Sequence, residues 1–270
     1  MKLGKGKPFL EVLASAIHED YRFPILEIFA FLYTLGTFVF ASFGSSIVTS
    51  NVTNESVAYT LTSSLLGLPL FIFIILIFKN IAYGFGGDLE KGIIQSYLSY
   101  PLKRWKILTA KLISAIGIAL ILFLTIQISA LYVLAPDVIS PYLGTVLLTY
   151  VANFSSSLFV AGILLLVTLV LRRGGLTLVV GIVLYFAMNI ISSVALVVAF
   201  ATDSQLPLQI MSVIAPNVVL SQYYSVNVAF GNGLWTPAFS EVLLFMGTSY
   251  AIIAGLFFFG YYYFSRRLGL

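Results

Sequence analysis

Cysteine is absent from this 270-residue sequence, histidine occurs once, and charged residues make up only 9% of the chain. Soluble domains carry about 25% charged residues, so the composition excludes an ordinary water-soluble domain. Without cysteine there is no disulfide and no thiolate metal site. The one histidine, His18, precedes the first long apolar run. A histidine-based proton relay, a Ser-His protease site or a histidine metal site within a membrane would therefore lack its central residue.

A phosphate-binding loop is also missing. The sequence contains no G-x-x-x-x-G-K-[ST] segment, so the chain has no recognisable means of holding a nucleotide. We therefore expect this chain to be a non-catalytic subunit without a cofactor or metal site of its own. If ATP energises it, ATP and Mg²⁺ must bind to a partner subunit.

Long apolar runs dominate what is present. Six runs of at least about 20 residues are each long enough to cross a bilayer as a helix. Helices are expected because the backbone groups of a segment in hydrocarbon must pair within that segment. No charged stretch between the runs is long enough to bury a core of its own. We predict an all-α polytopic membrane protein with a single domain, residues 1–270, and six spans: Pro24 to Val48, Tyr59 to Phe78, Ile107 to Leu134, Tyr142 to Leu171, Leu176 to Phe200 and Ser240 to Phe264.

The positions of lysine and arginine predict the orientation of the chain. Six crossings place every basic residue on one side, whereas Glu55, Asp137 and Asp203 fall on the other. By the positive-inside rule, both termini of this multi-pass cell-membrane protein are cytoplasmic. A basic face against anionic lipid accounts for the net charge of +4, and no nucleic-acid partner is needed. The basic residues are Lys2, Lys5, Lys7, Arg22, Lys79, Lys91, Lys103, Arg104, Lys106, Lys111, Arg172, Arg173, Arg266 and Arg267.

One ionisable residue, Glu27, lies inside a span, about one turn into the first helix. It could pair with Arg22 or reach the cytoplasmic headgroups, or it could take part in substrate or proton handling. Glu241, at the outer edge of the sixth span, is open to the same alternatives. Without paired acids inside the membrane, the sequence gives little support to an ion-coupled carrier.

Residues 9–20 form an amphipathic pattern, with Phe9, Val12, Ala16 and Ile17 on one helical face and His18 among the opposite polar residues. This pattern predicts a short helix lying in the cytoplasmic interface. Periodicity alone does not separate a membrane anchor from a helix that transmits force.

The longest cytoplasmic connection, residues 82–104, predicts a second amphipathic helix. Gly84, Gly86 and Gly87 are expected to loosen the chain after the second span, Asp88 is a candidate N-cap, and Pro101 ends the segment. The helix could lie on lipid, or it could fill a groove on a soluble partner. Its apolar positions are Leu89, Ile93, Ile94, Tyr97 and Leu98, and its polar positions are Glu90, Lys91, Gln95 and Ser99.

This segment resembles the cytoplasmic signature of type-2 ABC transporter permeases. The matching positions are Glu90, Gly92, Pro101, Arg104 and Lys111, and the motif covers about a tenth of the chain. The resemblance implies a half-transporter that pairs with a second permease subunit, identical or related, and with separate ATPase subunits. It also implies that transport is export. The implied docking residues for the ATPase are Glu90, Lys91 and Arg104 as polar contacts, and Leu89, Ile93 and Tyr97 as apolar anchors.

Residues 201–239 are unusual for an outer loop, because they contain one acid, no lysine or arginine, and many apolar residues. Their composition predicts short helices at the outer leaflet or a segment that re-enters it, broken at Pro207, Ala215-Pro216-Asn217 and Gly231-Asn232-Gly233. The resemblance implies an outer gate here, for which Pro216 and Asn217 are candidates. An interfacial lid without a gating role is the alternative.

The apolar spans favour an apolar or amphipathic cargo. Scattered polar groups such as Gln127, Asn153 and Asn189, and the serines at 155–157, are more typical of helix packing than of a ligand site. Two other classes stay open: an ATP-independent secondary carrier, which would need inverted repeats that are not evident, and a non-transport membrane assembly factor.

Overall fold

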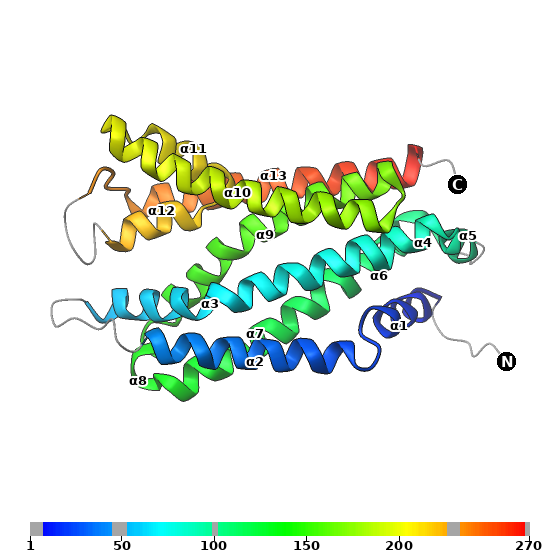
Figure 1. Ribbon diagram of the computed structural model, residues 1–270, viewed down its shortest axis with the longest axis horizontal. Coiled ribbons are helices and arrows are strands. Elements are labelled where there is room, and N and C mark those ends of the chain that lie inside the picture. Colours follow the sequence, from blue (N-terminus) through cyan, green and yellow to red (C-terminus); the bar gives the residue numbers. More distant parts are fainter. Residues whose placement is uncertain (1–7, 45–52, 99–101, 226–232, 268–270) are drawn as a thin grey trace.

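The computed structural model describes residues 8–44, 53–98, 102–225 and 233–267, and it is a bundle of helices running roughly along one axis (Figure 1). No β-strand occurs within these ranges. The prediction of an all-α polytopic membrane protein is confirmed. The elements are α1 (Pro8–Asp20), α2 (Ile25–Gly44), α3 (Asn54–Lys79), η2 (Asn80–Phe85), α4 (Gly86–Glu90), α5 (Ile93–Leu98), α6 (Arg104–Leu112), η3 (Ile113–Ile118), α7 (Ala119–Leu134), α8 (Pro136–Ile139), α9 (Leu143–Leu171), α10 (Gly174–Thr202), α11 (Leu206–Ile214), α12 (Asn217–Gln222), α13 (Phe239–Tyr262) and η5 (Tyr263–Arg267).

Five of the described helices are long and apolar enough to cross a membrane: residues 54–90, 104–134, 143–171, 174–202 and 239–266. The sixth span involves α2, which is bent by 63° from α1. The 20 residues of α2 extend about 30 Å, which matches the thickness of a hydrocarbon core. We therefore assign α2 as the first span and leave the amphipathic α1 outside it.

The two ends of the bundle differ in charge. One end carries α1, α4, α5, η5 and the junction between α9 and α10 (Figure 1). All described lysines and arginines belong to these elements, to residues beside them in the chain, to the end of α3 (Lys79) or to α6. We call this the basic end. The opposite end carries α8 and the starts of α3 and α13, with the acids Glu55, Asp137, Asp203 and Glu241.

Aromatic side chains fill the centre of the bundle, where α2, α3, α7 and α9 meet. Phe123 contacts Tyr33, Phe73 and Phe154, with ring centroids 5.2–5.5 Å apart. In the spans at 54–90 and 143–171, 56% of an apolar 18-residue stretch is buried inside the structure. In α10 the corresponding share is only 11%. One long face of α10 therefore has no partner within the described chain.

The glycines after the second span do not form a flexible stem, so that prediction is wrong. α3 continues through the π-helical turn η2 into α4 as one helix from Asn54 to Glu90. A Cβ atom on Gly84 would lie 2.5 Å from Asp20 Oδ1, and one on Gly86 would lie 3.1 Å from the side chain of Thr168. These two glycines allow neighbouring elements to pack closely against a continuous helix.

Between α10 and α13 the chain turns back into the bundle. α11 packs along α10 and α13, and α12 follows after a turn at Ala215 and Pro216. We call α11, this turn and α12 the returning hairpin. Ser249 Oγ in α13 donates a 3.3 Å hydrogen bond to the carbonyl of Ile214 at the hairpin's tip. Ser249 is ten residues beyond Phe239, so the tip lies about 15 Å along α13.

Candidate functional site

The described part of the predicted docking segment, residues 82–98 and 102–104, contains α4 and α5 at the basic end, and a sharp turn joins these two helices. Gly92 has a φ of +71°, a left-handed conformation that glycine adopts without strain. The turn separates α5 from α4, so the predicted single helix from Asp88 is two pieces. Glu90, Lys91 and Ile93 are exposed around the turn, and Ile93 retains 38% exposure. This exposed turn is the part of the segment that a partner could contact.

Leu89 is not available as an apolar anchor, which corrects the sequence-based assignment. Its side chain is only 6% exposed, and it packs in a cluster with Phe85, Ile94 and Phe264. The reason is that α4 extends the buried second span, and Leu89 points the same way as the buried face of that helix. Ile93 remains as an exposed apolar position, while Ile94 is completely buried.

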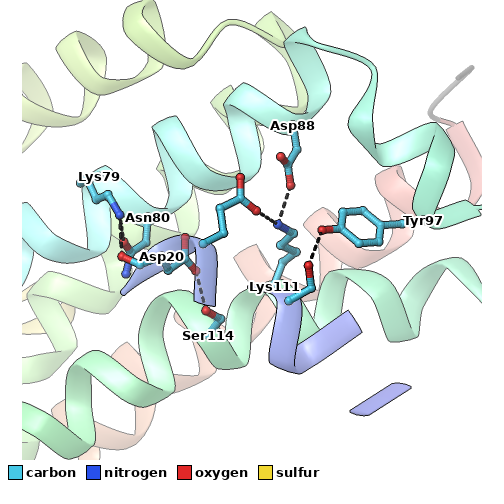
Figure 2. Close-up of polar contacts among 9 residues, drawn as sticks. Asp20, Lys79, Asn80, Asp88, Tyr97, Lys111 and Ser114 are labelled. Carbon is cyan, nitrogen blue, oxygen red and sulfur yellow. Dashed lines mark hydrogen bonds and ion pairs between the residues drawn. The ribbon is translucent and has the colours of Figure 1, made fainter. Parts of the chain in front are cut away.

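Asp88 belongs to a buried ion-pair cluster centred on Lys111 and does not cap a helix. Lys111 Nζ, from α6, lies 2.5 Å from Asp88 Oδ2 and 2.9 Å from Glu19 Oε2 (Figure 2). Asp88 and Lys111 are 1% and 2% exposed. Removing one partner of such a pair leaves an uncompensated buried charge and typically costs about 3–5 kcal/mol. The cluster therefore joins α1, α4 and α6.

Tyr97 extends this cluster to α5. Its ring lies 5.2 Å from Lys111 Nζ, a cation–π contact, and its hydroxyl lies 3.2 Å from Ser15 Oγ of α1 (Figure 2). Tyr97 is half-buried, so only part of its side chain is free to contact a partner as the sequence-based assignment expected. Its contacts fix α5 against α1 and α6.

A second polar cluster surrounds Asp20, the last residue of α1. Ser114 Oγ donates a 2.5 Å hydrogen bond to Asp20 Oδ2, and Lys79 Nζ donates a 2.7 Å hydrogen bond to its backbone carbonyl (Figure 2). Burial raises the pKa of Asp20 from 3.8 to about 6, although Ser114, Lys111 and Lys79 act in the opposite direction. The carboxyl group therefore binds its proton more tightly than an ordinary aspartate does.

The π-helical turns η2 and η3 meet at this cluster. Asn80 Nδ2, in η2, donates to the hydroxyl of Tyr21 and to the carbonyl of Ala115 in η3. The Tyr21 hydroxyl in turn donates to the carbonyl of Ser114, at 3.0 Å. The side chains of Tyr21 and Asn80 thus bind two backbone carbonyls of the π-helical turn η3. Here they hold α1 against the second and third spans.

Glu90 connects the docking segment to α10. Its Oε2 atom accepts a 3.0 Å hydrogen bond from the backbone N–H of Gly174, the first residue of α10. A Cβ on Gly174 would lie 2.7 Å from the carbonyl of Ala82, so the start of α10 packs directly on η2. Glu90 was expected to contact a partner, and the structure shows it used within the chain.

Three further predicted residues were Arg104, Pro101 and Glu27. Arg104 is half-buried at the start of α6, and Pro101 lies outside the described residues. Glu27 is exposed in the first turn of α2 and makes no ion pair with Arg22. An acid in a first turn is favoured by the helix dipole.

At the opposite end, Glu241 Oε2 accepts a 2.9 Å hydrogen bond from the N–H of Ala238, which gives it a capping role. Pro216 is buried at the tip of the returning hairpin, next to Asn217, and not at the outer surface. Of the predicted break points, residues 231 and 232 lie outside the described ranges. Among the described residues, no group of three or more metal-ligating side chains gathers in one place.

The two charged clusters were missed by sequence reasoning, although a signal was present. Asp20 follows Val12 and Ala16 at a spacing of four, so it lies on the buried stripe of α1. Lys111 likewise follows the buried Ile107 at a spacing of four. A charged residue on an apolar stripe requires a partner, which points to an ion pair or hydrogen bond between elements.

Comparison with models of protein families and with curated proteins finds no match to this chain.

Proposed function

We propose that this chain is the membrane-spanning half of an ATP-driven exporter of the type-2 ABC permease kind, working with a second permease subunit and separate ATPase subunits. The observation that carries the proposal is the exposed turn at residues 91–93, whose flanking residues make polar contacts with α1, through Tyr97 and Ser15, and with α10, through Glu90 and Gly174. A protruding segment that merely lay on lipid would not require these contacts. The resemblance at Glu90, Gly92, Arg104 and Lys111 supports the same assignment.

The coupling mechanism follows from these connections. ATP binding draws the two ATPase subunits together, and α5 moves with the subunit docked on it. Tyr97 carries that movement to α1 through Ser15, and Glu90 carries it to α10 through Gly174. Coupling requires only that the ATPase contacts α5 differently in the two states of the membrane helices.

The basic end faces the cytoplasm in this proposal, so both termini are cytoplasmic. The support is the gathering of all described lysines and arginines at that end. Because the chain has no cysteine, single thiols can be introduced without other changes. An impermeant maleimide added to intact cells is expected to label Asp203→Cys, and to label Lys91→Cys only after permeabilisation. Labelling of Lys91→Cys in intact cells would reverse the orientation.

The docking site is tested by co-purification with the cognate ATPase. Ile93→Asp places a charge on the exposed apolar side chain of α5, and we expect it to reduce the captured ATPase about tenfold, an effect of about 1.4 kcal/mol. The matched control Ile93→Leu keeps an apolar side chain of the same size and should capture normally. Undiminished capture by Ile93→Asp would remove α5 as the docking site, and failure of the unmodified chain to capture any ATPase would remove the proposed function.

Glu90→Gln separates docking from coupling. The substitution removes the negative charge of the side chain that accepts the hydrogen bond from the Gly174 N–H, and it leaves Ile93 unchanged. We expect normal capture of the ATPase with transport reduced several-fold. If Glu90→Gln instead loses the ATPase, then Glu90 contacts the partner directly and its link to α10 is not the coupling element.

A further inference from the structure

A polar cavity lies at the tip of the returning hairpin, well inside the bundle. It has a volume of about 280 Å³ and is lined by residues from α3, α9, α10 and the hairpin. Its depth is given by the positions of its lining residues: Asn153 is ten residues after the start of α9, and Ser192 is ten residues before the end of α10. Both lie about 15 Å from the opposite end, halfway through a hydrocarbon core of about 30 Å.

The lining of this cavity is hydrogen-bonding but uncharged. The remaining residues that line it are apolar or glycine. A charged group in this position would lose its hydration without meeting an opposite charge, at a considerable free-energy cost. The cavity therefore suits a neutral polar group. Its polar lining residues are Asn153, Ser156, Tyr185, Asn189, Ser192 and Asn217.

One hydrogen-bond acceptor of the cavity is unused within the described chain, whereas other polar groups of its lining already donate within the bundle. Asn153 and Asn189 each donate their side-chain N–H to a carbonyl within their own helix, at 2.8 Å, and Ser156 Oγ donates to the carbonyl of Asn153 at 3.1 Å. The Oδ1 atom of Asn217 is buried and has no partner among the described residues. A buried acceptor without a partner is costly, so a ligand that donates a hydrogen bond would be favoured here.

The cavity also has an exit toward the exposed face of α10. Asn189 both lines the cavity and is exposed, and the surrounding residues of α10, Phe186 and Ile190, are large, apolar and exposed. A molecule with a polar head in the cavity can therefore extend an apolar chain along the surface of α10.

We propose that this cavity binds the uncharged, hydroxyl- or amide-bearing head of a single-chain amphiphile. This inference rests on the proposed function, because the bound amphiphile would be the cargo of the exporter. The binding itself needs no ATPase. Asn217 receives the head at the hairpin's tip, and Asn153 and Ser192 contact it from α9 and α10. The returning hairpin thereby closes the cavity toward the opposite end.

Protection of a single introduced thiol tests the proposal. The Ser192→Cys variant of the cysteine-free chain is purified without ATPase in phosphatidylcholine nanodiscs. The rate at which its thiol reacts with N-ethylmaleimide is then measured. Three probes share one oleyl-type chain: mono-oleoyl glycerol, oleyl sulfate and oleyl trimethylammonium. We expect mono-oleoyl glycerol at about ten times its Kd to slow the reaction about tenfold, and the two charged probes to change it less than about twofold.

Two variants complete the test. Ser129→Cys lies in a groove between α2 and α7 of about 280 Å³ whose lining is more apolar, and its reaction should be the same with and without each probe. Adding Asn217→Leu to Ser192→Cys should abolish the protection without lowering the temperature of thermal unfolding. Equal protection by all three probes, protection at Ser129→Cys, or no protection by mono-oleoyl glycerol would overturn the proposal. Because no ATPase is present, these outcomes are independent of whether the chain captures one.

Discussion

Asp20 is the residue at which buried charge has the clearest consequence. It is 2% exposed and has charged neighbours on three sides: Glu19 on α1, Lys79 at the end of α3, and Lys111 on α6. Because burial disfavours the carboxylate, the folded protein binds a proton to Asp20 at a higher pH than the unfolded chain does. The free energy of unfolding therefore falls as the pH rises from about 4 to about 6, and it is constant in this respect above that range.

Asp20→Asn is expected to remove this dependence. The asparagine oxygen can still accept the hydrogen bond from Ser114, and the shift from 3.8 to about 6 sets an upper limit of about 3 kcal/mol for the gain at pH 7.5. Thermal unfolding in detergent, followed at several pH values by tryptophan fluorescence, should show the variant more stable at pH 7.5 and equal to the unmodified protein near pH 4. Asp137→Asn, an exposed acid on α8, is the control and should be neutral. A variant less stable than the unmodified protein at pH 7.5 would show that the carboxylate stabilises the fold.

For single residues, the sequence identified important positions more successfully than it identified their contacts. It identified Glu90 and Lys111 from the resemblance, but it gave no contact between Lys111 and Asp88, which are 23 positions apart. Leu89 was assigned to a partner because its helical spacing with Ile93 suggested one apolar face. The break at Gly92 separates the two residues, and a positive φ is a property of the folded turn that periodicity does not include.

Glycine packing is the feature that most changes the view of the second span. Three glycines in four residues suggested a flexible stem, yet the helix is continuous and two of the three lie against neighbouring elements. The composition of a segment does not distinguish a glycine that loosens a helix from one that lets another helix approach. Only the position of Asp20 and of the start of α10 decides between them.

The pair Gly84→Ala and Gly87→Ala distinguishes these two roles. A Cβ on Gly84 would lie 2.5 Å from Asp20 Oδ1, whereas a Cβ on Gly87 meets nothing within 4 Å. We expect Gly87→Ala to raise the free energy of unfolding by about 0.5–1 kcal/mol, since alanine favours the helix. Gly84→Ala should lower it by about 1–3 kcal/mol because the neighbouring side chain must move. Both values can be compared by thermal unfolding in the same detergent. Similar stabilisation by both variants would contradict the packing role of Gly84 and favour the flexible stem instead.

For the returning hairpin, the composition of the sequence predicted the general location of the segment but not its depth in the bundle. An outer segment with one acid and many apolar residues was expected to prefer the membrane boundary or to re-enter it. Its depth depends on contacts with distant helices, such as the hydrogen bond from Ser249 to Ile214, and these are not encoded in local composition. The candidate gate residues Pro216 and Asn217 were found from the sequence, but their position beside a mid-depth cavity was not.

For the whole molecule, the long apolar runs were sufficient to predict the bundle, because each run must form its own helix in hydrocarbon. They do not state which helices form the centre. α3 and α9 do so here, while α10 keeps an unpartnered face that carries the exposed polar residues Asn189 and Ser193 near its middle. Polar side chains at this depth rarely face lipid and typically contact another helix or a cavity. We therefore propose that the second subunit of the proposed exporter packs against this face of α10.

Cross-linking tests this arrangement with little change to the protein. Ser193→Cys, treated with a short bifunctional maleimide in membranes, should give a covalent dimer if two copies of this chain pack against each other through α10. Thr248→Cys, which is exposed at a similar depth on α13, is the matched control and should remain monomeric. The hydroxyl groups of Ser193 and Thr248 each donate only to a carbonyl of their own helix, so neither substitution breaks a contact between elements. Dimers from Thr248→Cys alone would move the interface to α13, and the cavity's exit along α10 would then open to lipid instead of to a second subunit.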